Sequence, residues 1–126
     1  MQAKTKSDER IEQMTFASVY PHYVQKVARK GRSLEELRTV IAWLTGFSNQ
    51  EIEDAIKQEL TFLAFFQAAN IHPNAGMITG SICGYKVQEI QNPLTQKVRM
   101  LDKLVDELAK GKSLDKILRN LSLIHI

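Results

Sequence analysis

Apolar residues recur every three or four positions along most of the chain, which is the period of an amphipathic helix. The first stripe covers residues 20–28, with Ser18 as a candidate N-cap and Gly31 as a stop signal. The second covers residues 34–44 and follows the capping box at residues 33–36, in which Ser and Glu side chains satisfy the first free backbone donors. These patterns predict two consecutive helices joined by a short turn.

Further capping signals predict the remaining helices. A second capping box at residues 48–51 opens a helix, and Thr61 is placed to cap a short one that must end by Pro73. Asn92 precedes a proline at the first position of the longest predicted helix, and Ser113 opens a last one. The stripe of the longest helix is Leu94, Val98, Leu101, Val105 and Leu108, widened by Leu104.

The elements together predict an all-α fold, a compact bundle of five or six short helices with one irregular segment around residues 70–92. Gly80 and Gly84 interrupt the apolar pattern in that segment, so a strand, a helical turn and a loop remain open there. A length of 126 residues is typical of one domain, and we expect a single helical domain over residues 1–126. Residues 1–13 are expected to form a partly ordered polar N-terminus, and residues 121–126 a tail.

Composition and charge narrow the class of protein. Hydrophobic residues make up 44% of the chain and charged residues 25%, which is ordinary for a globular protein. Cys83 is the single cysteine, so the chain has no internal disulfide, as expected in a reducing compartment. The first residues lack the apolar core of a secretory signal, and polar residues break the apolar segment near residue 70 before it reaches a membrane span. We expect a cytoplasmic protein without a membrane partner.

Three long stretches are similar to the small bacterial proteins of domain-of-unknown-function family 2200. They are RIEQMTFASVYPHYVQKVARKGR (10–32), VIAWLTGFS (40–48) and ITGSICGYKVQEIQNPLTQKVRMLDKLVDELAKGKSLDKILR (78–119). Residues 51–70 match less closely. The resemblance implies a bacterial cytoplasmic protein and carries no activity, cofactor or functional residue over to this chain.

Residues 38–57 fit the spacing of a helix-turn-helix unit, with Gly46 in the turn. The solvent face of its second helix would carry Glu51, Glu53 and Asp54, which repel the phosphates of DNA. A helix-turn-helix DNA-binding regulator is therefore the alternative function, and we expect nucleic acid not to be a partner of the protein.

A third hypothesis is a small enzyme that uses Tyr20, His22, Tyr23 or Cys83. His22 lies between the two tyrosines, where it is placed to act as an acid or base near a phenol. A partly exposed helical histidine and a small buried cysteine explain the same residues structurally. The three histidines lack the spacing of metal ligands, and no phosphate-binding or dinucleotide loop is present, so we expect neither a metal site nor a cofactor.

Residues 60–85 contain no Asp, Glu, Lys or Arg, although a quarter of the chain is charged. One interpretation is a hairpin at the centre of the core. The other is a self-association surface or the wall of a ligand pocket built from Phe62, Phe65, Phe66 and Met77. We therefore expect a non-enzymatic interaction or regulatory module, with a homo-oligomer as one form of it.

The formal net charge is +3, and two groups of basic residues lie near predicted helix ends. The first is Lys26, Arg29, Lys30 and Arg32, and the second is Lys110, Lys112, Lys116 and Arg119. Residues 31–37 and 111–117 also echo each other, which we interpret as shared turn chemistry. Cations at helix C-termini have a structural role against the helix dipole, so these groups alone do not indicate a partner.

Overall fold

The computed structural model describes residues 3–119, most of which are helical. The α-helices are α1 (Lys6–Gln13), α2 (Phe16–Ala28), α3 (Leu34–Thr45), α4 (Asn49–Lys57), α5 (Phe62–Ala68), α6 (Pro93–Ala109) and α7 (Leu114–Ile117). Two short 3-10 helices, η1 (Pro73–Met77) and η2 (Val87–Glu89), flank an antiparallel hairpin of β1 (Ser81–Ile82) and β2 (Tyr85–Lys86). The prediction of an all-α fold is confirmed, with seven α-helices in this part of the chain instead of five or six.

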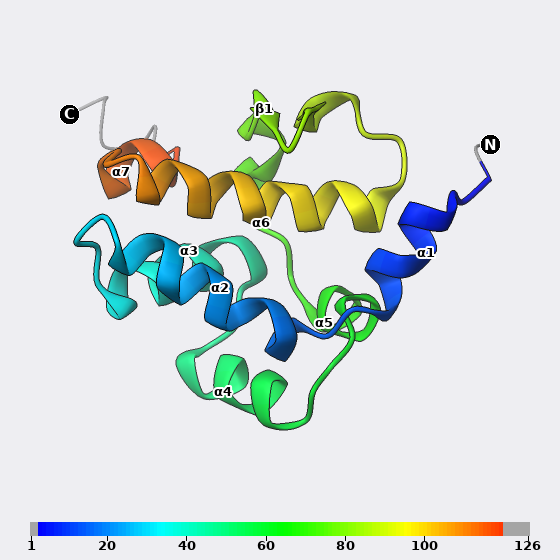
Figure 1. Cartoon of the computed structure of the whole chain (residues 1–126), viewed down its shortest axis with the longest axis horizontal. Helices are drawn as coiled ribbons and strands as arrows, with labels where there is room; N and C mark the ends of the chain where they lie inside the picture. The colour runs from blue at the N-terminus through cyan, green and yellow to red at the C-terminus, as the bar shows by residue number, and fades with distance from the viewer. Residues whose placement is uncertain (1–2, 120–126) are drawn as a thin grey trace.

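The longest helix, α6, organises the arrangement of the others. It crosses the molecule from the end where α1 and α5 lie to the opposite end, where α7 follows it (Figure 1). α2 and α3 pack against α6, α4 packs against α2 and α3, and the hairpin lies against another side of α6. Because so many elements contact α6, its apolar stripe lies at the centre of the fold.

Four of the predicted capping residues make their hydrogen bonds at the observed helix starts, whereas Ser113 precedes α7 without a side-chain bond. The Ser33 and Ser48 hydroxyls each accept a hydrogen bond from the backbone N–H three residues later, and both capping boxes are complete. Thr61 caps α5 and Asn92 caps α6. These local interactions explain why the boundaries of α3 to α6 follow from the sequence.

The start of α2 differs from the prediction. Thr15, and not Ser18, is the N-cap, because its hydroxyl accepts a hydrogen bond from the Ser18 N–H at 3.1 Å. Phe16 is thereby drawn into the helix and fully buried. Pro21 consequently lies inside α2, beyond the first turn of the helix. Because proline has no backbone N–H, the carbonyl of Ala17 has no helical donor.

Within the N-terminal segment that the sequence predicted to be polar and partly ordered, residues 6–13 form α1. Thr5 and Asp8 make a capping box, and the Thr95 hydroxyl of α6 donates to the second Asp8 oxygen at 2.7 Å. Ile11 is buried in the core. A single buried apolar residue in an otherwise polar segment gives no detectable stripe, so only the tertiary contact with α6 reveals this helix. The expected tail at residues 121–126 lies outside the described residues.

The irregular segment contains the hairpin that sequence patterns left open. Cys83 and Gly84 form its two-residue turn, with φ of 53° and 83°. Both values lie in the left-handed region, which suits the right-handed twist of a tight hairpin and explains the glycine. Val87 then donates to the Gly80 carbonyl at 3.0 Å and closes the segment onto α6.

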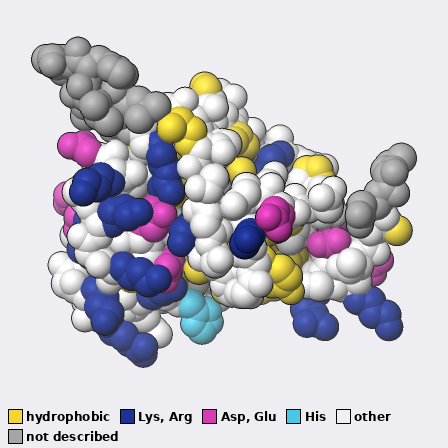
Figure 2. Space-filling model, turned by 90° about the horizontal axis from the view of Figure 1, so that it is seen from above, with side chains coloured by type: hydrophobic (Ala, Val, Ile, Leu, Met, Phe, Trp, Pro, Cys, Tyr) yellow, Lys and Arg dark blue, Asp and Glu magenta, His cyan; other side chains and the backbone are white. Residues whose placement is uncertain are grey.

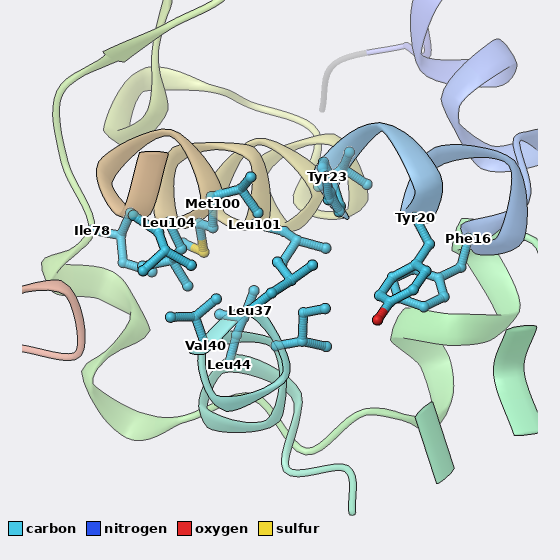
Figure 3. Packing of buried hydrophobic residues seen from close by; sticks show 14 of the residues in the cluster. Phe16, Tyr20, Tyr23, Leu37, Val40, Leu44, Ile78, Met100, Leu101 and Leu104 are labelled. Carbon is cyan, nitrogen blue, oxygen red and sulfur yellow. The ribbon is translucent and has the colours of Figure 1, made fainter. Parts of the chain in front are cut away.

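The core forms where α6 meets α3 and α2 (Figure 3). Leu101, Leu104 and Leu108 of α6 are fully buried, and the first two face Leu37 and Leu44 of α3. The predicted stripe is therefore confirmed, although Leu94 at its start is only partly buried. Within residues 3–119, no helix combines the length and apolar composition needed to cross a bilayer.

Candidate functional site

The four polar candidates from the sequence do not converge on one site. The Tyr20 hydroxyl accepts a hydrogen bond from Arg38 Nε at 2.6 Å. Tyr23 lies one turn later in α2 and bonds to a residue of α6. His22 is exposed between them, and Cys83 is exposed at the hairpin turn. The expected catalytic grouping is therefore not assembled.

Tyr23 is the most perturbed of these groups. Its hydroxyl donates to Asp102 Oδ1 at 2.6 Å, and the other Asp102 oxygen accepts from Arg99 Nη1 at 3.0 Å. Burial, reinforced by the Asp102 carboxylate, raises the pKa of Tyr23 well above its usual value. A buried phenol that stays protonated and donates to a paired carboxylate is a structural link between α2 and α6.

The aromatic candidates of α5 are core residues. Phe62, Phe65 and Phe66 are 1%, 0% and 4% exposed. α5 packs against both α1 and α6, and Phe16 of α2 stacks on Phe65 with ring centroids 4.3 Å apart. These neighbours cover every ring, so the expected exposed aromatic face does not exist. Met77 in η1 is 41% exposed but stands apart from this covered cluster.

The second helix of the predicted helix-turn-helix unit is α4. Glu51 is exposed on it, while Glu53 pairs with Arg38 and Asp54 accepts from Gln50 at 2.9 Å. A pocket of about 390 Å³ between α3 and α4 has Leu34, Ala42 and Ile52 among its lining residues. The carboxylates thus lie along the helix that would have to approach DNA.

A larger groove of about 1120 Å³ opens beside the N-terminal half of α6. Residues 3–8, the hairpin turn and the loop before α6 line it. On its floor Asp8 is held by Thr95, while Arg99 pairs with Asp102 beneath the ring of Tyr85. The charged groups on the floor are therefore engaged within the fold. In the same described part of the chain, no group of three His, Cys, Asp or Glu residues is placed to hold a metal ion.

The two basic groups, which lie eighty positions apart in the sequence, meet at one end of the molecule. Tyr23 of α2 bonds to Asp102 of α6, and Lys26 of α2 pairs with Asp106 of α6 at 3.1 Å. Lys26 follows Tyr23 by three residues, and Asp106 follows Asp102 by four. Partners therefore advance together along both helices, which shows that α2 and α6 run parallel. Their C-terminal ends lie side by side, and Figure 2 shows Lys and Arg side chains gathered at one end of the molecule.

We call this surface the basic end. It comprises Lys26, Arg29, Lys30, Arg32, Lys110, Lys112, Lys116 and Arg119.

Equivalent turns end the two parallel helices. Gly31 donates to the Ala28 carbonyl and Arg32 to that of Val27, and residues 111 and 112 repeat both bonds after α6. In both turns the glycine is left-handed, with φ of 76° at Gly31 and 89° at Gly111, as this helix ending requires. The sequence echo at residues 31–37 and 111–117 thus corresponds to two adjacent turns in space.

Arg32 joins these turns. Its Nη1 donates to the carbonyl oxygens of Leu108 and Lys112 at 3.1 and 2.9 Å, and its Nε and Nη2 donate to Glu36. Parallel helices place two negative dipole ends together, and the guanidinium offsets this repulsion. The Arg32 hydrogen bond, followed by the backbone bond from Ser33, lowers the pKa of Glu36 to about 2.

Two carboxylates of α6, Asp106 and Glu107, lie beneath the cations of the basic end. The side chains of Asp106 and Glu107 are 14% and 6% exposed, while their lysine partners Lys26, Lys110 and Lys112 are 46%, 72% and 42% exposed. Burial alone raises the pKa of Asp106, but hydrogen bonds from Lys110 and Lys26 outweigh it and lower this pKa. Cations therefore outnumber carboxylates in the outer layer of this surface, where Glu35 and Asp115 are the exposed acidic residues of residues 31–37 and 111–117.

The other exposed cations of the basic end have no acidic partner. Arg29, Lys30 and Lys116 make no ion pair within residues 3–119. From the sequence, each basic group was explained separately as a complement to a helix dipole, and their closeness in space was not predicted. The echo of residues 31–37 in residues 111–117 indicated that the two turns are alike, but no signal in the sequence indicated that they are adjacent.

Comparison with known proteins gives a family. A sequence model described as "Uncharacterized protein conserved in bacteria (DUF2200)" matches residues 10–119. A solved structure, "Crystal structure of uncharacterized protein SP1917", is similar at 38% identity and a TM-score of 0.82, covering 94% of this chain and 96% of that one. No curated protein matches the chain. The chain therefore belongs to the DUF2200 family of uncharacterized proteins conserved in bacteria.

Proposed function

We propose that the chain is a cytoplasmic, non-enzymatic interaction module that binds an anionic macromolecule through the basic end. The observation that carries this proposal is the layering of charge, with the exposed side chains of Lys26, Lys110 and Lys112 over the largely buried carboxylates of Asp106 and Glu107. Structural needs account for Arg32 and Arg119, which are largely buried and bonded within the fold. They do not account for Arg29, Lys30 and Lys116.

The small net charge of the whole chain supports binding of an anion at the basic end and not over the whole surface. The whole chain carries only +3, so cations gathered at one end leave the rest of the surface close to neutral. Such an asymmetric field attracts and orients a polyanion before contact. The exposed thiol of Cys83 agrees with the reducing conditions of the cytoplasm.

The other functions have less support. An enzymatic function lacks support because the candidate side chains do not come together. The hydroxyls of Tyr20 and Tyr23 bond to different partners, and His22 and Cys83 are exposed to solvent. DNA recognition by α4 would place Glu51 and Asp54 against phosphates. Self-association through α5 lacks its anchors, because Phe62, Phe65 and Phe66 are buried.

Retention on immobilised heparin tests the proposal. The variant Arg29→Glu/Lys30→Glu/Lys116→Glu should elute at clearly lower salt than the unmodified protein. The matched control is Lys6→Glu/Arg10→Glu/Lys57→Glu, which changes the net charge equally at exposed positions outside the basic end. Circular dichroism of both variants checks that they are folded. Equal loss of retention in the two variants would mean that only net charge matters, and the proposal would fail.

A further inference from the structure

We infer that the anionic partner is a double-stranded nucleic acid, which the basic end holds by the phosphate backbone; this inference rests on the proposed function. Four observations carry it: cations fixed in place, a shared plan of two helix ends, an acidic α4, and described turns that hold no aromatic side chain and, as a large exposed apolar one, Leu34 alone. Each favours a regular, rigid polyanion over other anionic partners.

The cations of the basic end are held in place from below. Lys26 and Lys110 both contact Asp106, at 3.1 and 3.0 Å through different oxygens, so their ammonium groups stand on either side of one carboxylate. Lys112 and Arg119 similarly share Glu107, at 3.5 and 2.6 Å. A set of charges anchored to two parallel helices loses little side-chain freedom on meeting an equally fixed set of phosphates.

Two adjacent helix ends present these charges as a repeated unit. The turns after α2 and α6 have the same hydrogen bonds, and Arg32 ties one to the other through the Lys112 carbonyl. The turn after α2 carries the exposed cations Arg29 and Lys30, and the turn after α6 carries Lys110 and Lys112. A duplex carries one charge per about 1.7 Å of its axis, so it offers phosphates to both cationic turns at once.

The surface lacks what other partners need. Single-stranded nucleic acid binds by stacking bases on aromatic rings, and no Phe, Tyr or Trp belongs to the described turns at the basic end. A membrane surface or a protein partner needs apolar or aromatic anchors. The nearest large exposed apolar side chain is Leu34 at the start of α3, a single residue that lies beside the α3–α4 pocket.

Contact is expected with the backbone and not with base edges. The described turns carry Lys and Arg side chains that suit phosphate oxygens, and such contacts position a protein without reading sequence. α4, the helix that would enter a groove in a helix-turn-helix complex, presents Glu51 at its exposed start. Binding is therefore sequence-independent.

The test measures binding of the full chain by gel shift and calorimetry over a series of salt concentrations. The probes are random-sequence DNA and RNA duplexes of equal length, their single strands, poly-glutamate, and vesicles of anionic phospholipid. Duplexes should bind at least tenfold more tightly than every other probe. DNA and RNA duplexes present the same phosphate groups, so comparing their affinities shows which duplex the basic end binds more tightly.

The variants make the assignment specific. Each phosphate contact adds about 0.9 to the slope of log affinity against log salt, so Arg29→Glu/Lys30→Glu/Lys116→Glu should reduce that slope by about 2 to 3. The control Lys6→Glu/Arg10→Glu/Lys57→Glu should leave it unchanged. Single changes to Gln at the same three basic-end positions give smaller, stepwise reductions and protect the test against misfolding of the triple variant.

The outcomes separate this inference from the proposed function. In one outcome, retention on heparin depends on the basic end, but single strands, poly-glutamate or vesicles bind as tightly as duplexes or more tightly. This result would overturn the duplex inference and would still support the interaction module. Loss of both the retention difference and duplex binding would overturn both. A duplex preference that survives the triple variant unchanged would place the duplex elsewhere on the chain and overturn the inference.

Discussion

Arg32 donates a hydrogen bond through Nη1 to the main-chain carbonyl oxygen of Lys112 at 2.9 Å, which joins the turn after α2 to the turn after α6. The same nitrogen reaches the Leu108 carbonyl, and the rest of the guanidinium pairs with Glu36. One side chain therefore holds together the ends of two parallel helices and the start of α3.

Arg32→Met should lower the free energy of unfolding by about 1–3 kcal/mol, because it leaves carbonyl acceptors at the end of α6 and one carboxylate without their donor. Urea denaturation followed by circular dichroism measures the loss. Arg29→Met is the matched control, since Arg29 is exposed and has no ion-pair partner among residues 3–119, and its effect should be close to zero. Equal effects of the two changes would show that the bridge does not stabilise the fold.

Glu36→Gln should make stability less dependent on acid pH. The Arg32 hydrogen bonds lower the pKa of Glu36 to about 2 in the folded chain, below its unfolded value near 4.5. The stabilisation is therefore complete above about pH 4.5 and is lost as pH falls toward 2. Gln keeps the capping hydrogen bond but not the charge. Unfolding curves should show the unmodified protein more stable at pH 7, with the difference closing between pH 4.5 and 2.

Tyr23→Phe should lower the free energy of unfolding by about 1 kcal/mol near neutral pH, because Asp102 loses a hydrogen-bond donor. Burial raises the pKa of Tyr23, so the neutral phenol stabilises the fold fully below its ordinary pKa, and this contribution is lost as pH rises toward the folded value. The difference between the two proteins should accordingly shrink in alkali. A gap that widens above pH 10 would contradict this assignment of the proton.

Phe65→Ala should lower the free energy of unfolding by about 3–5 kcal/mol, since its ring is fully buried against Phe16 and Phe47. Phe66→Glu should unfold the chain and not merely dissociate an oligomer. Denaturation and light scattering on the same samples distinguish the two effects. A folded, smaller species from Phe66→Glu would restore the interface that the sequence suggested for this helix.

Asn49→Ala and Gln50→Ala should leave duplex affinity and its salt dependence unchanged, because the basic end and not α4 makes the contacts. Both residues are exposed at the start of α4, where a recognition helix would meet base edges. Gel shifts with one random and one genomic duplex measure the effect. Sequence-selective binding that these changes abolish would reinstate the helix-turn-helix hypothesis.

The sequence predicted those parts of the fold that depend on neighbours within one helix. The capping box at Ser33 and Glu36 and the stripe from Val98 to Leu108 are local patterns, and both are present as expected. The burial of Phe62 and Phe66 could not be judged from α5 alone, because α1, which covers that helix, has only Ile11 to mark it.

The candidate site depended on contacts that no local pattern contains. The pairing of Lys26 with Asp106 joins residues of helices far apart in the chain, and it arises from the parallel packing of α2 and α6. Two modest basic groups become one surface only through this packing. The echo around Gly31 and Gly111 was visible, but it gave the turn type and not their adjacency.

The single tryptophan gives the chain an intrinsic optical reporter. Trp43 stacks on His72 with ring centroids 4.2 Å apart, and backbone bonds from His72 to Leu44 and from Asn70 to Thr45 hold the two segments together. Its fluorescence should therefore change when this junction opens. Since Trp43 lies near the C-terminal end of α3, away from the turns of the basic end, emission can follow unfolding in a sample to which a polyanion has been added, without a label on the surface that binds it.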